Sequence, residues 1–210
     1  MISKDVLSLS SLDTIDEILD GLSKSKKNPK ILDVGCGCGC SVNYLKEKGM
    51  DARGVDYSEE IINLGKKTYT GIDLKVMDAN NLEFPHNYFD LILFECSLSV
   101  MKNTKKILSS SINILKEDGL LLISDFFLKQ ADLYEGVYTM DYWNKLFDDL
   151  NLEIVHFQDK SKEWRNYIGM TLWEYGDLSV LLRGNQNKCL NKNIFKKETG
   201  YFLAILKKRG

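Results

Sequence analysis

The chain has 210 residues, of which 44% are hydrophobic and 28% charged, and it contains only two prolines. This length and composition fit one globular domain and exclude a low-complexity or collagen-like chain. Its 28 lysines and arginines stand against 30 acids, giving a formal charge of −2. That balance gives no electrostatic reason to expect nucleic acid or an anionic membrane as the main partner.

No apolar run approaches the roughly 18–20 residues that a membrane helix requires. The first five residues are quickly polar, unlike the hydrophobic segment of a signal peptide. Five cysteines, three of which alternate with glycines over positions 36–40, do not have the spacing of a secreted disulfide scaffold. We therefore expect a cytoplasmic protein that does not contact membranes.

Periodicity divides the chain into one leading helix and an alternating core. Apolar residues at helical spacing predict an amphipathic helix over 6–23, so that residues 1–28 pack as an N-terminal segment on a domain over 29–210. Short apolar runs then predict strands over 30–34, 51–55, 72–77, 88–95, 119–126, 152–158 and 201–207. Helices are expected between them over 41–48, 58–67, 104–115 and 140–150. Such alternation predicts an α/β fold with a doubly wound, mostly parallel seven-stranded sheet and helices on both faces.

The segment over 159–199 interrupts this alternation, because it is too long for a plain connection between two strands. Its residues 163–182 are expected to form a helix rich in aromatic side chains. The segment either caps a substrate pocket or packs on the sheet or on a second subunit. A homodimer formed through it is one expected assembly.

Three glycines, Gly35, Gly37 and Gly39, follow the first strand and precede a helix. They allow a tight turn and a close approach of the backbone to a ligand. A dinucleotide-binding G-x-G-x-x-G pattern would need glycine at Cys40. The carboxylate of Asp33, two residues before the first glycine, would repel a pyrophosphate but suit a cationic ligand. These features argue against a nicotinamide-dependent dehydrogenase, the main rival among enzymes.

Further acids follow the next two strands. Asp56 ends the second strand, where a carboxylate can accept hydrogen bonds from vicinal ribose hydroxyls, and Tyr57 offers a flat neighbour for a base. Asp78 follows the third strand, where a carboxylate can accept from an exocyclic amine. Asp90, in contrast, is expected to order the start of the fourth strand.

Four segments, ILDVGCGCG, GVDYS, MDANNLEFPHNYFDLI and ILKEDGLLLISDFF, resemble the successive motifs of class I S-adenosylmethionine-dependent methyltransferases of the small-molecule type. The likeness runs from about residue 29 to 127, and residues 140–157 follow the same plan. It implies a Rossmann-like methyltransferase fold and S-adenosylmethionine as cofactor, with S-adenosylhomocysteine as product.

The resemblance also implies roles for individual residues. In the family the acid before the glycines binds the methionine ammonium, the acid after the second strand binds the ribose, an aromatic and an apolar residue enclose adenine, and the acid after the third strand meets its amino group. The corresponding cofactor-binding residues are Asp33, Gly35, Cys36, Gly37, Gly39, Asp56, Tyr57, Ile61, Asp78, Ala79 and Glu95.

Two features depart from the family pattern. Cys38 and Cys40 replace the usual small residues of the loop, and the turn before the fifth strand reads Lys-Glu-Asp-Gly over 116–119. The loop cysteines suggest thiol or arsenic chemistry, but a zinc site would need a second cysteine pair, so no metal is expected. They are also small side chains that fit a crowded turn.

The expected reaction is methyl transfer to a small-molecule acceptor by direct displacement at the sulfonium methyl. Glu95 and Cys96, just after the fourth strand, are the catalytic candidates, although no role can be assigned to either from sequence. Two alternatives stay open: a cofactor-binding protein without turnover, and an arsenite or thiol methyltransferase.

Overall fold

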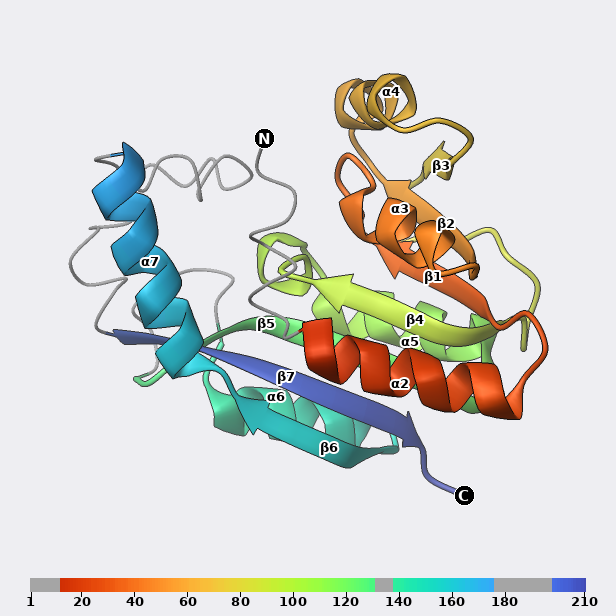
Figure 1. The fold of residues 1–210 in the computed structure, drawn as a ribbon. Coiled ribbons are helices and arrows are strands. Elements are labelled where there is room, and N and C mark those ends of the chain that lie inside the picture. Colours follow the sequence, from red (N-terminus) through yellow and green to blue (C-terminus); the bar gives the residue numbers. More distant parts are fainter. Residues whose placement is uncertain (1–11, 131–137, 176–197) are drawn as a thin grey trace.

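A computed structural model of the protein describes residues 12–130, 138–175 and 198–210. Within these ranges, seven strands form one sheet in the order β3-β2-β1-β4-β5-β7-β6 (Figure 1). The strands are β1 Lys30–Val34, β2 Asp51–Asp56, β3 Asp73–Val76, β4 Phe89–Glu95, β5 Leu115–Leu128, β6 Leu152–Asp159 and β7 Thr199–Lys208. Neighbours among β1 to β5 pair in parallel, whereas β7 is antiparallel to both β5 and β6. The predicted doubly wound, mostly parallel sheet is confirmed.

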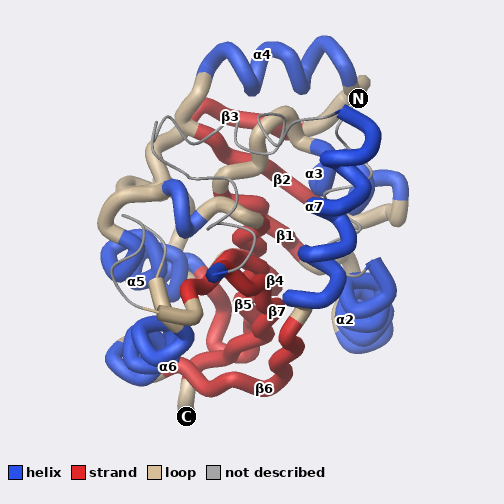
Figure 2. The backbone as a smooth tube through the Cα atoms, turned by 90° about the vertical axis from the view of Figure 1, so that its left-hand side faces the viewer, coloured by secondary structure: helices blue, strands red, loops and turns tan. Residues whose placement is uncertain are grey.

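Helices cover both faces of this sheet. They are α2 Leu12–Ser25, α3 Cys40–Glu47, α4 Glu59–Thr68, α5 Thr104–Ile114, α6 Met140–Asp149 and α7 Ser161–Tyr175, with a 3-10 turn, η1, at Leu98–Val100. Figure 2 shows α5 and α6 on one side of the strands and α2 and α3 on the other. None of the helices in the described ranges is long and apolar enough to cross a bilayer.

The alternation of side chains along the central strands explains the two layers. Ile31 and Leu91 belong to the cluster that contains Leu19 and Leu22 of α2, whereas Leu32 and Ile92 belong to the cluster under α5 and α6. Successive residues of a strand face opposite sides of the sheet, so a strand buried on both faces is apolar throughout. Helix α2 packs on the core through Leu19 and Leu22, and residues 6–11 of the predicted leading helix lie outside the described ranges.

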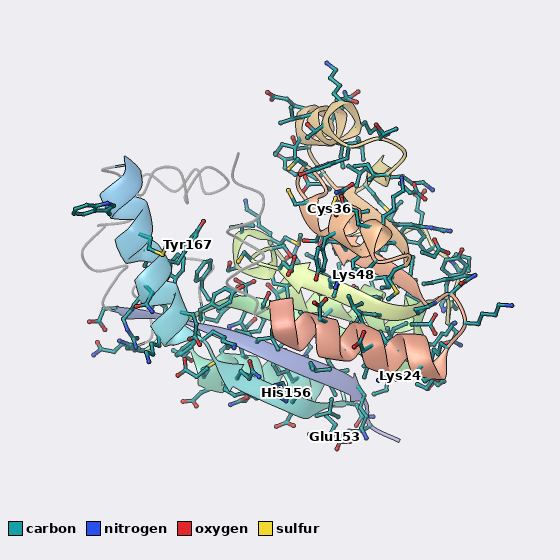
Figure 3. All side chains as sticks on the ribbon, viewed as in Figure 1. Lys24, Cys36, Lys48, Glu153, His156 and Tyr167 are labelled. Carbon is teal, nitrogen blue, oxygen red and sulfur yellow. The ribbon has the colours of Figure 1, made fainter. Side chains whose placement is uncertain are left out.

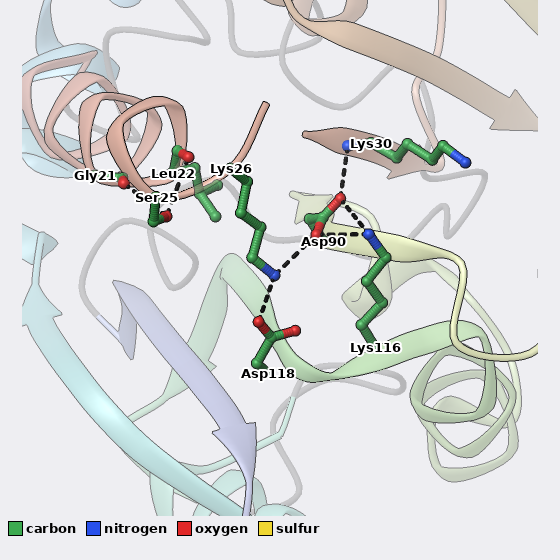
Figure 4. Close-up of polar contacts among 8 residues, drawn as sticks. All are labelled: Gly21, Leu22, Ser25, Lys26, Lys30, Asp90, Lys116 and Asp118. Carbon is green, nitrogen blue, oxygen red and sulfur yellow. Dashed lines mark hydrogen bonds and ion pairs between the residues drawn. The ribbon is translucent and has the colours of Figure 1, made fainter. Parts of the chain in front are cut away.

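A cluster of ion pairs closes the amino end of the sheet (Figure 4). Asp90, which is 2% exposed, accepts hydrogen bonds from the backbone N–H of Lys30 at 2.9 Å and from the Nζ atoms of Lys26 and Lys116, also at 2.9 Å. Lys26 also pairs with Asp118 at 2.8 Å. Asp90 therefore orders the start of β4, as predicted, and its carboxylate charge is fully compensated.

The turn expected over 116–119 lies inside β5, which begins at Leu115 directly after α5. Leu115 pairs with Phe89 and the next pair is Leu120 with Leu91, so residues 116–119 stand opposite Asp90 alone and bulge out of the ladder. The ion pair of Lys116 with Asp90 connects this bulge to β4. Strand β3 is shorter than expected, and β5 and β7 are longer, as is common for element boundaries read from sequence.

Helix α7 stands at the carboxyl end of the strands, beyond β6 (Figure 1). It begins at Ser161, and residues 176–182 of the predicted helix lie outside the described ranges. Trp164 and Ile168 are buried, and the Trp164 indole N–H donates to Thr199 Oγ1 at 3.4 Å, whereas Trp173 is 92% exposed. One face of α7 thus packs on the sheet, and the cap and the homodimer stay predictions.

Candidate cofactor-binding site

The glycine loop between β1 and α3 is held against the strand ends at Gly35 and borders open space at Gly37. All three glycines have positive φ, between 55° and 80°. The N–H groups of Gly35 and Cys36 donate to the carbonyl of Val55, and a Cβ at Gly35 would lie 2.6 Å from that of Ser97. A Cβ at Gly37 would meet no atom within 4 Å. Side chains are thus excluded where the loop contacts the strand ends, and the space beside Gly37 is open.

Asp33 is a buried carboxylic acid among other acids. It is 2% exposed, and its Oδ1 accepts no hydrogen bond from any residue of the described ranges. Burial raises the pKa of Asp33 well above its usual value, and the negative charges of Glu95 and Asp56 raise it further. An acid with an unused buried oxygen and anionic neighbours provides a site that a cation would stabilise.

Glu95, at the end of β4, forms the other side of this acidic group. The hydroxyl of Ser41, in the first turn of α3, donates to Glu95 Oε2. The predicted candidate therefore lies beside the glycine loop, connected to the helix that the loop begins.

Asp56 ends β2 and joins the glycine loop to α4. Its Oδ2 accepts from the N–H of Gly37 at 3.0 Å, and its Oδ1 accepts from the N–H of Ser58 at 2.9 Å. Each carboxylate oxygen has two lone pairs, so acceptor capacity remains for a ligand diol. Next to it, Tyr57 is 83% and Ile61 39% exposed. Apolar surface is therefore exposed in this position, and the predicted contact of Tyr57 and Ile61 with adenine stays a prediction.

Asp78 and Ala79 lie at the neighbouring strand end. The N–H of Met77 donates to the carbonyl of Asp56, which brings the two ends together. Asp78 is exposed, and its Oδ1 accepts from both the N–H and the side-chain amide of Asn80, which lowers the pKa of Asp78. Ala79 is buried against the core. Asp78 therefore has a turn-forming role, and its contact with adenine stays a prediction.

The loop cysteines point to different surroundings. Cys36 Sγ lies over Gly54, where a Cβ would be 2.6 Å from it. Cys38 and Cys40 have their sulfurs 3.6 Å apart, and Cys40 Sγ lies 3.1 Å from the Tyr69 hydroxyl. Burial raises the pKa of Cys36, and the hydrogen bond with Cys40 raises that of Cys38. In the described part of the chain, no three His, Cys, Asp or Glu side chains gather as a metal site.

Beyond Glu95, the site is bordered by aromatic residues. Trp164 and Tyr167 belong to the aromatic helix that the sequence predicts, whereas Phe126 and Tyr201 were not singled out. Cys96 has a φ of 49° and places its sulfur 3.3 Å from the hydroxyl of Tyr201, on β7. The ring centroid of Phe126 lies 5.3 Å from that of Tyr201 and 4.7 Å from that of Trp164. Figure 3 shows Tyr167 on α7 and Cys36 in the glycine loop at this end of the sheet.

Asp125 is a further residue that the sequence analysis did not place at the site. It is fully buried, and its two oxygens accept from the N–H groups of Ser99 at 2.9 Å and Phe126 at 2.7 Å. Burial raises its pKa to about 6. The signal was present in the sequence, because Ser124 and Asp125 interrupt the longest apolar run. Its contact with Ser99 holds η1, and with it the loop that carries Cys96.

The open α/β sheet carries a glycine loop and strand-end acids at the position where such sheets bind ligands. This combination of fold and motifs is that of class I S-adenosylmethionine-dependent methyltransferases. The family model described as "Methyltransferase domain" matches residues 25–177. The chain belongs to this family.

Relatives of known name agree with this assignment. The chain is 25% identical to phosphoethanolamine N-methyltransferase of Plasmodium falciparum over 93% of this chain and 65% of that protein. It is 29% identical to demethylmenaquinone methyltransferase of Paenarthrobacter aurescens over 64% of this chain and 53% of that protein. The chain thus spans between about half and two thirds of the length of these relatives.

The structural likeness concerns the fold alone. A Haemonchus contortus phosphoethanolamine N-methyltransferase 2, solved with phosphomonomethylethanolamine and S-adenosylhomocysteine, superimposes with a TM-score of 0.71 at 17% identity, over 95% of this chain and 53% of that one. The [4+2]-cyclase SpnF superimposes with a TM-score of 0.72, also at 17% identity, over 92% and 81%. The same fold therefore occurs in proteins named for different reactions.

Proposed function

We propose that the protein uses S-adenosylmethionine to methylate a small-molecule acceptor by direct displacement at the sulfonium methyl. The observation that carries the proposal is Asp33, a carboxyl that is 2% exposed and surrounded by the acids Glu95 and Asp56. Its Oδ1 accepts no hydrogen bond from the described residues. A cationic ammonium group fits such a site, whereas the pyrophosphate of a dinucleotide does not.

The residues at the strand ends fit the rest of this cofactor. Asp33 and Glu95 would hold the ammonium, and Asp56 would accept from the ribose hydroxyls. The exposed apolar surfaces of Tyr57 and Ile61 would enclose adenine, with Asp78 and Ala79 at its amino group. The open space beside Gly37 suits a close approach of the ligand.

Bound there, S-adenosylmethionine would supply a methyl group on an electrophilic sulfonium. The contribution of the chain is alignment and exclusion of water, because the leaving group is already activated. Cys96 and Glu95 border the region where the acceptor would enter. A general base is required only for an acceptor that is protonated at the working pH.

A small acceptor is supported by two observations. The relatives are named for methylation of phosphoethanolamine and of demethylmenaquinone, both small molecules. The chain is also close to neutral, so it offers no general electrostatic attraction for nucleic acid.

The second candidate is a protein that binds the cofactor but does not transfer methyl groups. It is favoured by the structural similarity to a [4+2]-cyclase, which shows that this fold also serves a protein named for another reaction. The arsenite or thiol methyltransferase rests on the loop cysteines alone.

The test begins with calorimetric titration of the protein with S-adenosylmethionine and S-adenosylhomocysteine. We expect micromolar binding that Asp56→Ala abolishes and Asp20→Asn, an exposed acid of α2, leaves intact. Incubation with methyl-labelled cofactor and a metabolite extract should then label small molecules. Labelling of bulk protein or RNA instead would refute the acceptor class, and binding without any labelling would favour the second candidate.

A further inference from the structure

Cys38 and Cys40 form a closely spaced thiol pair in the glycine loop. They flank Gly39, whose φ of 80° turns the backbone, and their sulfurs lie 3.6 Å apart. Both residues are partly exposed, and the Tyr69 hydroxyl lies 3.1 Å from Cys40 Sγ. Cys36 and Cys96 have other neighbours, since Cys36 packs over Gly54 and Cys96 lies beside Tyr201.

Packing fixes the backbone that carries this pair. A Cβ on Gly39 would lie 2.9 Å from Leu74, and a Cβ on Gly65 of α4 would lie 2.3 Å from the carbonyl oxygen of Cys38. The N–H of Gly39 donates to the carbonyl of Cys36 at 2.9 Å. A direct disulfide would need the two sulfurs about 2 Å apart. At 3.6 Å the two sulfurs are in contact as free thiols, close enough for one atom to bind both.

We propose that Cys38 and Cys40 form a dithiol site for trivalent arsenicals. Both thiols lose their protons, two arsenic–sulfur bonds form, and the arsenical oxygen leaves as water with those protons. Arsenic and sulfur keep their oxidation states, so no oxidant is required. The second sulfur binds intramolecularly, and such linkage strengthens binding by about 10²–10⁴-fold over one thiol.

The site adjoins the proposed cofactor position. Cys38 follows Gly37, whose N–H donates to Asp56, and Cys40 begins α3. An arsenical on the pair would therefore compete with S-adenosylhomocysteine or distort its loop. By linkage, each ligand weakens the other by the same factor. This coupling rests on the proposed function, whereas the dithiol site does not.

The experiment uses phenylarsine oxide on the full chain in a Cys189→Ser background, with binding followed by intact mass and titration. We expect one arsenical per chain, retained in excess monothiol and removed by 2,3-dimercaptopropanol. Cys38→Ser and Cys40→Ser should each weaken binding by at least about 100-fold. Cys36→Ser, the matched control from the same loop, should bind like its parent, and circular dichroism establishes that each variant is folded.

The outcomes separate the two claims. Equal binding by the parent and a folded Cys38→Ala variant, or no retention in excess monothiol, would overturn the dithiol site. Retention by the parent together with competition by S-adenosylhomocysteine supports both site and coupling. If S-adenosylhomocysteine binds but does not compete, the coupling is refuted. If it does not bind at all, the proposed function fails while the dithiol site stands.

Discussion

Asp33→Asn should affect stability and ligand binding in opposite directions. In the empty protein the Asp33 carboxyl is buried, with Glu95 and Asp56 raising the cost of its charge. The amide removes that charge and keeps the shape. We therefore expect the free energy of unfolding of Asp33→Asn at pH 7 to be equal to or higher than that of the wild type. Residues arranged for a ligand commonly reduce the stability of the empty protein.

Binding of S-adenosylmethionine should weaken in the same variant. Removing one partner of a buried, hydrogen-bonded charge pair costs about 2–5 kcal/mol. At 1.4 kcal/mol per factor of ten, this corresponds to roughly 30- to 4,000-fold in affinity. The assays are urea unfolding without ligand and calorimetric titration with the cofactor.

Asp90→Asn is the matched control, because Asp90 is equally buried but is surrounded by Lys26, Lys116 and the N–H of Lys30. Removing one partner of a buried pair costs about 3–5 kcal/mol, and we expect about 2–4 here because the lysine side chains are 21% and 36% exposed. Cofactor binding by folded Asp90→Asn should be unchanged. The reasoning is refuted if Asp33→Asn loses as much stability as Asp90→Asn, or binds the cofactor like the wild type.

The two variants should also differ in pH dependence. The pKa of Asp33 is raised in the folded protein, so its stabilising contribution is present below about pH 3.9 and is lost as the pH rises through the raised value. The pKa of Asp90 is lowered, so its contribution is present above about pH 3.9 and is lost as the pH falls through the lowered value. Relative to wild type, Asp33→Asn should therefore gain stability with rising pH, whereas Asp90→Asn should lose it.

Three further outcomes are expected. Gly65→Ala should destabilise the protein by about 1–3 kcal/mol in urea unfolding and weaken cofactor binding, because the new methyl group would lie 2.3 Å from the carbonyl oxygen of Cys38 in the glycine loop. Its control is Gly21→Ala, where the new methyl group meets nothing within 4 Å and should stabilise α2 by up to about 1 kcal/mol. Trp164→Ala should cost about 3–5 kcal/mol because the side chain is 2% exposed, whereas Trp173→Ala, 92% exposed, should leave the unfolding midpoint unchanged. The pKa of Asp125 is raised to about 6, so its stabilising contribution is present below about pH 3.9 and lost as the pH rises through 6. Carboxyl titration by NMR near pH 4 would contradict this value.

The positions of the residues proposed to bind the cofactor could be predicted because these residues follow local rules. Asp33 and Asp56 end consecutive parallel strands, and the ends of such strands meet at one edge. The periodicity that defines the strands therefore also places the acids. The glycine loop between them lies in the same short stretch of sequence, so no long-range pairing had to be known.

The neighbours of that half could not be predicted, because they depend on strand order. Tyr201 reaches Cys96 across 105 positions of the chain because β7 inserts between β5 and β6. Nothing local in the sequence encodes that insertion. The start of β5 was likewise missed, because Leu115 pairs with Phe89 across a bulge at residues 116–119 and no local pattern encodes that pairing.

This difference in origin explains why a cofactor can be inferred and an acceptor cannot. The groups proposed to hold the cofactor come mostly from one continuous segment, whose geometry is fixed by its own turns and pairings. The aromatic border comes instead from β5, α7 and β7, where Phe126, Trp164 and Tyr201 pack on one another. Substitutions there can change the acceptor space without disturbing Asp33 or Asp56. Acceptor preference should therefore vary among members of this fold while the strand-end acids keep their places.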